Sequence, residues 1–177
     1  MAMTSFNIVD GMPPSGNKKL LDGILRKEWG FDGVVISDYN AMGELITHGV
    51  AEDFKEVANL SMQAGVDIEM MSTSYVRYVE ELIGEGKLTI EQLDTAVMRV
   101  LKLKDELGLF ENPYGKANED EAEKLILCKE HRALVQRAAE ESAVLLKNDG
   151  ILPFSKSVKS VAVIGPLGDT GEIIGFW

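Results

Sequence analysis

The sequence predicts an α/β protein with a parallel sheet, and two observations support this. Three short apolar runs end near Phe6, Ser37 and Met70, about 31 and 33 residues apart, a spacing typical of β-α-β units. Amphipathic segments with helical periodicity separate these runs. Because a helix connects each run to the next, we expect right-handed crossovers and parallel strands.

The run at residues 33–37 is the clearest strand, since apolar and β-branched residues follow one another as in a strand buried on both faces. The run at residues 3–6 is shorter. In residues 66–70, Asp67 and Glu69 alternate with apolar residues, which leaves two interpretations open. The segment is either a half-buried strand or a buried strand whose carboxylates point along a polar crevice.

Capping signals predict the helices between and after these strands. Asn17 is an expected N-cap, and Asp53 with Glu56 resembles a capping box that precedes a helix ending at Gly65. Later in the chain, Thr89 with Gln92 predicts a second capping box, and the polar, acidic residues 116–124 predict a linker. A helix is expected at residues 129–147 and a further buried strand at residues 160–165.

Composition and charge exclude several classes of function. The chain of 177 residues carries 18 Lys and Arg against 29 Asp and Glu, a net charge of −11, which disfavours nucleic acid as a partner. No apolar run approaches the roughly 18 residues of a membrane span. Residues 1–6 lack the pattern of a secretory signal, which favours a cytoplasmic location. The single cysteine, Cys128, cannot form an internal disulfide.

Asp38 is the most informative candidate residue because it directly follows the best strand. The carboxyl ends of parallel strands carry the active sites of α/β enzymes, so Asp38 is a candidate nucleophile, general base or metal ligand. An aspartate that only caps the next turn is the alternative. The two histidines and one cysteine lack the spacing of a zinc site, and we expect no metal and no cofactor. Residues 163–171 match no nucleotide-binding fingerprint, although a nucleotide-binding α/β protein stays an alternative.

Several stretches resemble glycoside hydrolase family 3, the β-glucosidase family, and its bacterial members in particular. They comprise Met3-Thr4-Ser5-Phe6-Asn7, Trp29-Gly30-Phe31-Asp32-Gly33, Val35-Ile36-Ser37-Asp38, Ala64-Gly65-Val66-Asp67, Val144-Leu145-Leu146-Lys147-Asn148 and Val163-Ile164-Gly165-Pro166. The resemblance implies a (β/α)8 TIM-type barrel joined to an α/β sandwich domain. Residues 1–115 would be the C-terminal part of the barrel domain, residues 116–159 an interdomain linker and helix, and residues 160–177 the start of the sandwich domain. Both domains would be incomplete.

The resemblance also implies a reaction, the retaining hydrolysis of terminal β-D-glucosyl or related β-glycosyl residues. Asp38 falls at the position of the family's nucleophile, which forms a covalent glycosyl-enzyme. Tyr39, where many relatives have Trp, would line the sugar subsite. Met3 and Phe6 fall where the family has Met and often Tyr in the same pocket, and Phe6 lacks the hydroxyl.

The expected substrate is a small β-glycoside or oligosaccharide, but a retaining mechanism needs a second carboxyl as acid/base. In the family this group comes from a region downstream of the point where this chain ends. We therefore do not assign it to Glu44, Asp67 or Glu69. We expect the chain alone to be inactive, and a non-catalytic carbohydrate-binding or interaction fragment is the alternative.

Overall fold

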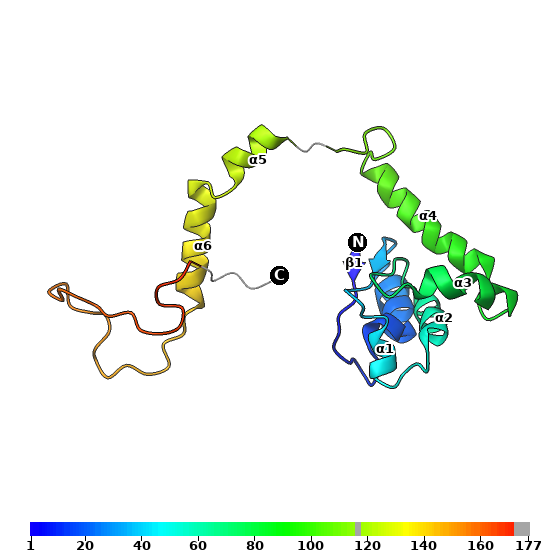
Figure 1. Ribbon diagram of the computed structural model, residues 1–177, viewed down its shortest axis with the longest axis horizontal. Helices are drawn as coiled ribbons and strands as arrows, with labels where there is room; N and C mark the ends of the chain where they lie inside the picture. Colours follow the sequence, from blue (N-terminus) through cyan, green and yellow to red (C-terminus); the bar gives the residue numbers. More distant parts are fainter. Residues whose placement is uncertain (116–117, 172–177) are drawn as a thin grey trace. The chain divides into compact units, whose positions relative to one another are not determined.

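The computed structural model describes residues 1–115 and 118–171, and the chain divides into two units (Figure 1). The first unit spans Met1–Ala117 and the second spans Asn118–Trp177. The first unit contains the sheet and the candidate site. None of the helices in the described parts of the chain is long and apolar enough to cross a membrane.

The predicted parallel order of the three runs is confirmed. β1 (Ala2–Met3) pairs in parallel with β2 (Val35–Ile36), with Met3 opposite Ile36. On the other side of β2, Ile36 forms a parallel bridge with Ile68. The regular strands are only two residues long, so the fold is α/β with few strands and many helices. Because β2 lies between β1 and Ile68, Ser37 and Asp38 at its end lie between the segments that follow β1 and Ile68.

Helices connect and follow these strands. They are η1 (Pro14–Gly16), η2 (Lys19–Glu28), α1 (Glu44–Thr47), α2 (Phe54–Ala64), α3 (Ser74–Gly84) and α4 (Ile90–Glu106). The predicted capping box of α4 is confirmed, since Thr89 and Gln92 cap each other reciprocally. For α2 only the N-cap is confirmed: the Asp53 carboxylate accepts a hydrogen bond from the amide of Glu56, but the Glu56 carboxylate accepts from the amide of Glu52 instead of Asp53. Gly65 ends α2 with a φ of 100°. The sequence predicted η2 as a helix, but its wider π-helical form was not anticipated.

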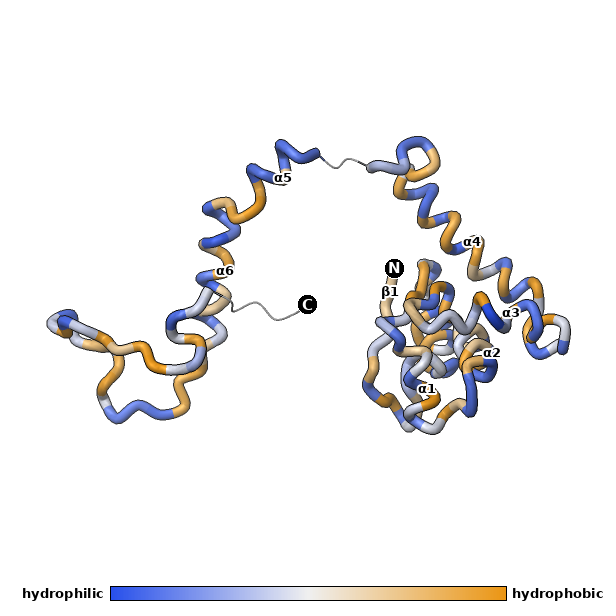
Figure 2. The backbone as a smooth tube through the Cα atoms, viewed as in Figure 1, coloured by the Kyte–Doolittle hydropathy of each residue, from blue (hydrophilic) through white to orange (hydrophobic). Residues whose placement is uncertain are grey.

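Two apolar clusters stabilise the first unit. One cluster packs Val35 of β2 against Leu21 of η2, Leu45 of α1 and Val57 of α2. The other joins α2, α3 and α4 through residues such as Leu82. Figure 2 shows that hydrophobic and hydrophilic residues alternate along α4, as expected for a helix with one apolar face. The first cluster fixes η2, α1 and α2 against β2, the strand that leads to Asp38.

In the described residues, the second unit consists of α5 (Glu119–Leu125), α6 (Lys129–Ser142) and an irregular segment with turns. α6 ends at Ser142 rather than at residue 147. The predicted strand at residues 160–165 is wrong for the described structure, in which this segment forms no strand. A strand needs a neighbour for its backbone hydrogen bonds, and the described residues of this unit contain no other strand. Part of the predicted start of the sandwich domain, residues 172–177, lies outside the described residues.

Candidate active site

Asp38 lies where β2 ends, in a turn fixed by backbone hydrogen bonds. The amide of the buried Ser37 donates to the carbonyl of Ile68 at 2.9 Å, which continues the ladder up to the turn. Asp38 Oδ1 accepts a hydrogen bond of 2.6 Å from the amide of Tyr39, and the carbonyl of Asp38 accepts one of 3.1 Å from Ala41. One carboxylate oxygen therefore caps the turn, and the partly exposed side chain sits at the carboxyl edge of the sheet.

The other three candidate residues occupy the same edge of the sheet or its connections. Met3 ends β1, Phe6 lies three residues later, and Tyr39 follows Asp38. The side chains of Met3, Phe6 and Tyr39 are each about half exposed. The buried hydroxyl of Thr4 lies 2.8 Å from the hydroxyl of Ser15, which anchors the chain after β1 to η1.

Sequence reasoning missed a buried charge cluster beneath this edge. The carboxylate of Asp67 accepts hydrogen bonds from the side chain of Arg26 at 2.7 Å, from the side chain of Arg99 at 2.9 Å and from the amide of Val35 at 2.8 Å. Arg26 also donates to the carbonyl of Gly33 at 3.0 Å. Burial lowers the pKa of Arg26, and the charge of Asp67 acts in the opposite direction. Two interpretations of residues 66–70 were open, a half-buried strand or a buried one with its carboxylates in a polar crevice. The buried side chain of Asp67 agrees with the second.

Glu69, the next carboxylate after Asp67, binds the first residues of α3. It accepts hydrogen bonds from the hydroxyl of Ser72, the amide and hydroxyl of Ser74 and the amide of Tyr75, at 2.5–2.8 Å. The hydroxyl of Tyr75 donates to the carbonyl of Val66 at 2.8 Å. Burial, with Glu69 and Asp67 nearby, raises the pKa of Tyr75 well above its usual value. Glu69 thus fixes the loop that follows the bridge of Ile68 to β2.

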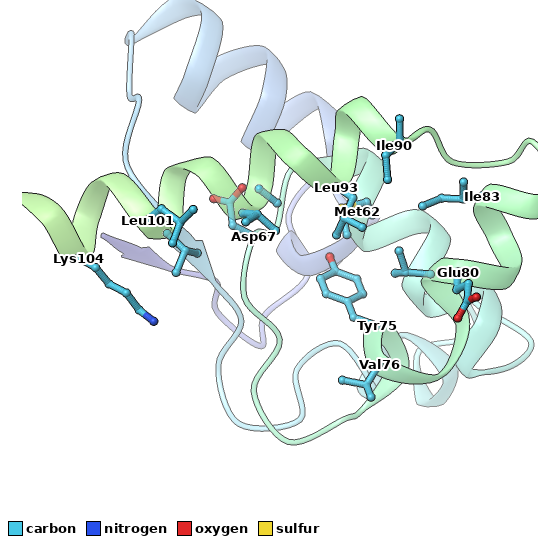
Figure 3. A pocket seen from close by; sticks show the side chains of 14 residues that line it. Met62, Asp67, Tyr75, Val76, Glu80, Ile83, Ile90, Leu93, Leu101 and Lys104 are labelled. Carbon is cyan, nitrogen blue, oxygen red and sulfur yellow. The ribbon is translucent and has the colours of Figure 1, made fainter. Parts of the chain in front are cut away.

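Two further features lie outside this edge. His48 is exposed and follows the last residue of α1. A cavity of about 700 Å³ lies between α3 and α4, with Ile83 on one helix and Leu93 and Leu101 on the other (Figure 3). Asp38 does not line this cavity. Among residues 1–115 and 118–171, no group of three or more His, Cys, Asp or Glu side chains could hold a metal ion.

Active sites of α/β enzymes lie at the carboxyl ends of parallel strands, and Asp38 occupies such a strand end in this chain. Comparison with known proteins identifies the family. Residues 1–103 match the family model for the glycosyl hydrolase family 3 N terminal domain, and the chain belongs to this family. The resemblance stated from the sequence motifs is therefore confirmed.

Individual relatives and solved structures agree with this membership. The chain is 39% identical over 180 residues to the periplasmic beta-glucosidase of Salmonella typhimurium, covering 99% of this chain and 23% of the relative. It is 36% identical over 168 residues to a putative beta-xylosidase of Formosa agariphila, covering 93% and 22%. The crystal structure of a beta-glucosidase from Listeria innocua superposes with a TM-score of 0.76 at 51% identity, covering 87% of this chain and 21% of that chain. The chain thus spans less than a quarter of the length of these relatives.

Proposed function

We propose that this chain supplies the nucleophile of a retaining β-glycosidase that acts on terminal β-D-glucosyl or related β-glycosyl residues. The observation that carries the proposal is the place of Asp38, at the carboxyl edge of a parallel sheet in a chain of glycosyl hydrolase family 3. Relatives named beta-glucosidase and beta-xylosidase support the substrate class. The Listeria innocua enzyme has been crystallised with glucose, and a mutant of it with laminaribiose.

The proposed reaction has two displacements at one carbon. A carboxylate oxygen of Asp38 attacks the anomeric carbon, the bond from that carbon to the aglycone oxygen breaks, and the aglycone leaves with a proton from a general acid. Water, deprotonated by the same group, then attacks the anomeric carbon of the glycosyl ester and releases Asp38. Tyr39, Met3 and Phe6 are proposed to line the pocket for the sugar.

The general acid is proposed to lie outside this chain. Two acids near the site are already engaged, because Asp67 is buried against two arginines and Glu69 binds the start of α3. A general acid must exchange protons with the substrate, and a carboxylate held in four hydrogen bonds is poorly suited to this. We therefore propose that the 177-residue chain has no turnover on its own.

The domain assignment follows the same reasoning. We propose residues 1–115 as the C-terminal part of a barrel domain, residues 116–159 as a linker with a helix, and residues 160–177 as the start of a sandwich domain. The family match over residues 1–103 and the division of the chain after Ala117 support the first boundary.

Covalent labelling tests the nucleophile. In the full-length enzyme that carries this chain, a 2-deoxy-2-fluoro-β-D-glucoside is expected to leave the sugar on the peptide that contains Asp38, as read by mass spectrometry. Asp38→Ala should abolish turnover, whereas Asp10→Ala, which removes an exposed acid paired with Lys19, should not. A sugar found on another carboxylate would reject the assignment.

The isolated chain gives a separate test. Hydrolysis of an aryl β-glucoside by the purified 177-residue chain, lost on Asp38→Ala, would show that the acid/base lies within it. Sugar binding by this chain without turnover is the result that the alternative, a non-catalytic carbohydrate-binding fragment, also predicts, and the labelling of Asp38 in the full-length enzyme separates the two.

A further inference from the structure

The segment at residues 70–73, which follows the bridge of Ile68 to β2, is hydrogen-bonded to the turn that carries Asp38. The amide of Met70 donates to the hydroxyl of Ser37 at 2.8 Å, and the carbonyl of Met70 accepts a hydrogen bond of 3.0 Å from the amide of Asn40. Ser37 and Asn40 enclose Asp38 and Tyr39 in the sequence. The backbone of Met70 is therefore fixed on both sides of the proposed nucleophile.

The same segment contains two residues in the left-handed backbone region. Met71 has a φ of 72° and Thr73 has a φ of 57°, values that are unfavourable for residues other than glycine. The hydrogen bonds of Glu69 to Ser72 and to Ser74 hold this conformation in place. Such strain persists only where the surroundings impose it, and it is concentrated at functional sites.

The strained segment presents an apolar side chain at the edge of the site. Met71 is 61% exposed, although covering a methionine side chain with an apolar partner lowers the free energy. β1 and Ile68 flank β2 on opposite sides. Phe6 follows β1 and therefore lies on one side of Asp38. Met71 follows Ile68 and therefore lies on the other side.

We propose that Met71 lines the subsite for the aglycone and determines specificity there, an inference that rests on the proposed function. The residues proposed for the sugar, Met3 and Phe6, belong to the β1 side of Asp38. On the opposite side, Met71 is then the residue of this chain that the leaving group can contact. A methionine side chain is flexible and polarisable and makes favourable contacts with aromatic rings, so the favoured aglycones are apolar or aromatic.

The test compares two substrates that share a sugar. In the full-length enzyme, Met71→Ala is expected to lower kcat/KM for 4-nitrophenyl β-D-glucoside about 3- to 10-fold, the effect of losing one sulfur–aromatic contact. It should leave kcat/KM for β-D-glucosyl fluoride unchanged, because fluoride has no aglycone to contact. Met98→Ala is the matched control, since Met98 on α4 is also 61% exposed, and neither substrate should be affected.

A second variant separates the side chain from the backbone strain. Glycine adopts a positive φ without strain, so Met71→Gly should show the same selective loss with an unfolding midpoint that is unchanged or higher. Equal losses for both substrates in Met71→Ala would overturn the proposal, because the segment would then act by positioning the Asp38 turn. No loss with either substrate, or full aryl-glucoside activity in Met71→Gly, would also overturn it.

The proposed function and this inference fail in different ways. If the 2-fluoro sugar labels another carboxylate, both are wrong. If it labels Asp38 at the normal rate while Met71→Ala leaves the ratio between the two substrates unchanged, only the aglycone subsite is wrong.

Discussion

The carboxylate of Asp67 receives a hydrogen bond of 2.7 Å from the Arg26 side chain, and both side chains are nearly inaccessible to solvent, at 1% and 8% exposure. This ion pair joins η2 to the segment next to Ile68, between residues 41 positions apart in the sequence. Through the amide of Val35, the same carboxylate also holds β2, three residues before Asp38. The strand that carries the proposed nucleophile is thus fixed by a buried charge.

Asp67→Asn is expected to lower the free energy of unfolding by about 3–5 kcal/mol, because removing one member of a buried ionic cluster leaves an uncompensated charge. The variant keeps the size of the side chain but removes the charge that faces Arg26 and Arg99. Urea denaturation followed by circular dichroism measures the change. Asp94→Asn, at an exposed site on α4, is the control and should change stability by no more than about 0.5 kcal/mol. Equal effects of the two variants would contradict this account.

The local features of the first unit could be predicted from the sequence because their causes lie within a few residues. The Asp53 cap needs only an acceptor three residues before an amide, and Gly65 needs only the absence of a Cβ. The parallel order followed from the alternation of strands and helices. Asp38 could be placed at the strand end for the same reason.

The remaining features depend on long-range contacts. Arg99 lies 32 residues from Asp67, and no spacing in the sequence indicates that the two side chains meet. Glu69 and Asp67 look alike in an alternating strand pattern, yet one caps α3 and the other is buried against two arginines. The segment at residues 160–165 has a strand composition, but a strand also requires a partner.

Thr89→Ala should lower the free energy of unfolding by about 1 kcal/mol, because it removes the N-cap of α4. The Thr89 hydroxyl accepts from the amide of Gln92 at 3.3 Å, and the side chain of Gln92 accepts from the amide of Thr89 at 2.8 Å. Thr89→Ser should restore most of the stability. Thr95→Ala is a matched control within the same helix: the Thr95 hydroxyl donates back to the carbonyl of Glu91, a contact that does not stabilise a helix. A larger loss at Thr95 than at Thr89 would reject the capping argument.

Tyr75 predicts a dependence of stability on alkaline pH. Burial raises the pKa of Tyr75 in the folded protein, so above the unfolded pKa of about 10 the unfolded state loses this proton first. The contribution of neutral Tyr75 is complete below that pH and declines as the pH rises toward the folded pKa. Tyr75→Phe lacks the titration and loses the hydrogen bond to Val66, so it should be less stable by about 1 kcal/mol at neutral pH.

The difference in unfolding free energy between the unmodified protein and Tyr75→Phe should therefore shrink between about pH 8 and about pH 11. Urea titrations of both proteins at each pH measure it. Tyr114→Phe, at a side chain that is 90% exposed, is the control and should leave the pH dependence unchanged. A constant difference between the unmodified protein and Tyr75→Phe would show that ionisation of Tyr75 is not linked to unfolding.

Variants of Tyr39 and of Met71 are expected to differ in how they affect the two substrates. If its half-exposed ring lines the sugar subsite, Tyr39→Ala should lower kcat/KM roughly 10- to 100-fold, the effect of losing the burial of one aromatic side chain. The loss should be the same for 4-nitrophenyl β-D-glucoside and β-D-glucosyl fluoride, because both carry the sugar. Tyr39→Trp should retain most activity, whereas the exposed Tyr114→Ala should retain all of it. A loss confined to the aryl glucoside would instead place Tyr39 beside the aglycone, on the same wall as Met71.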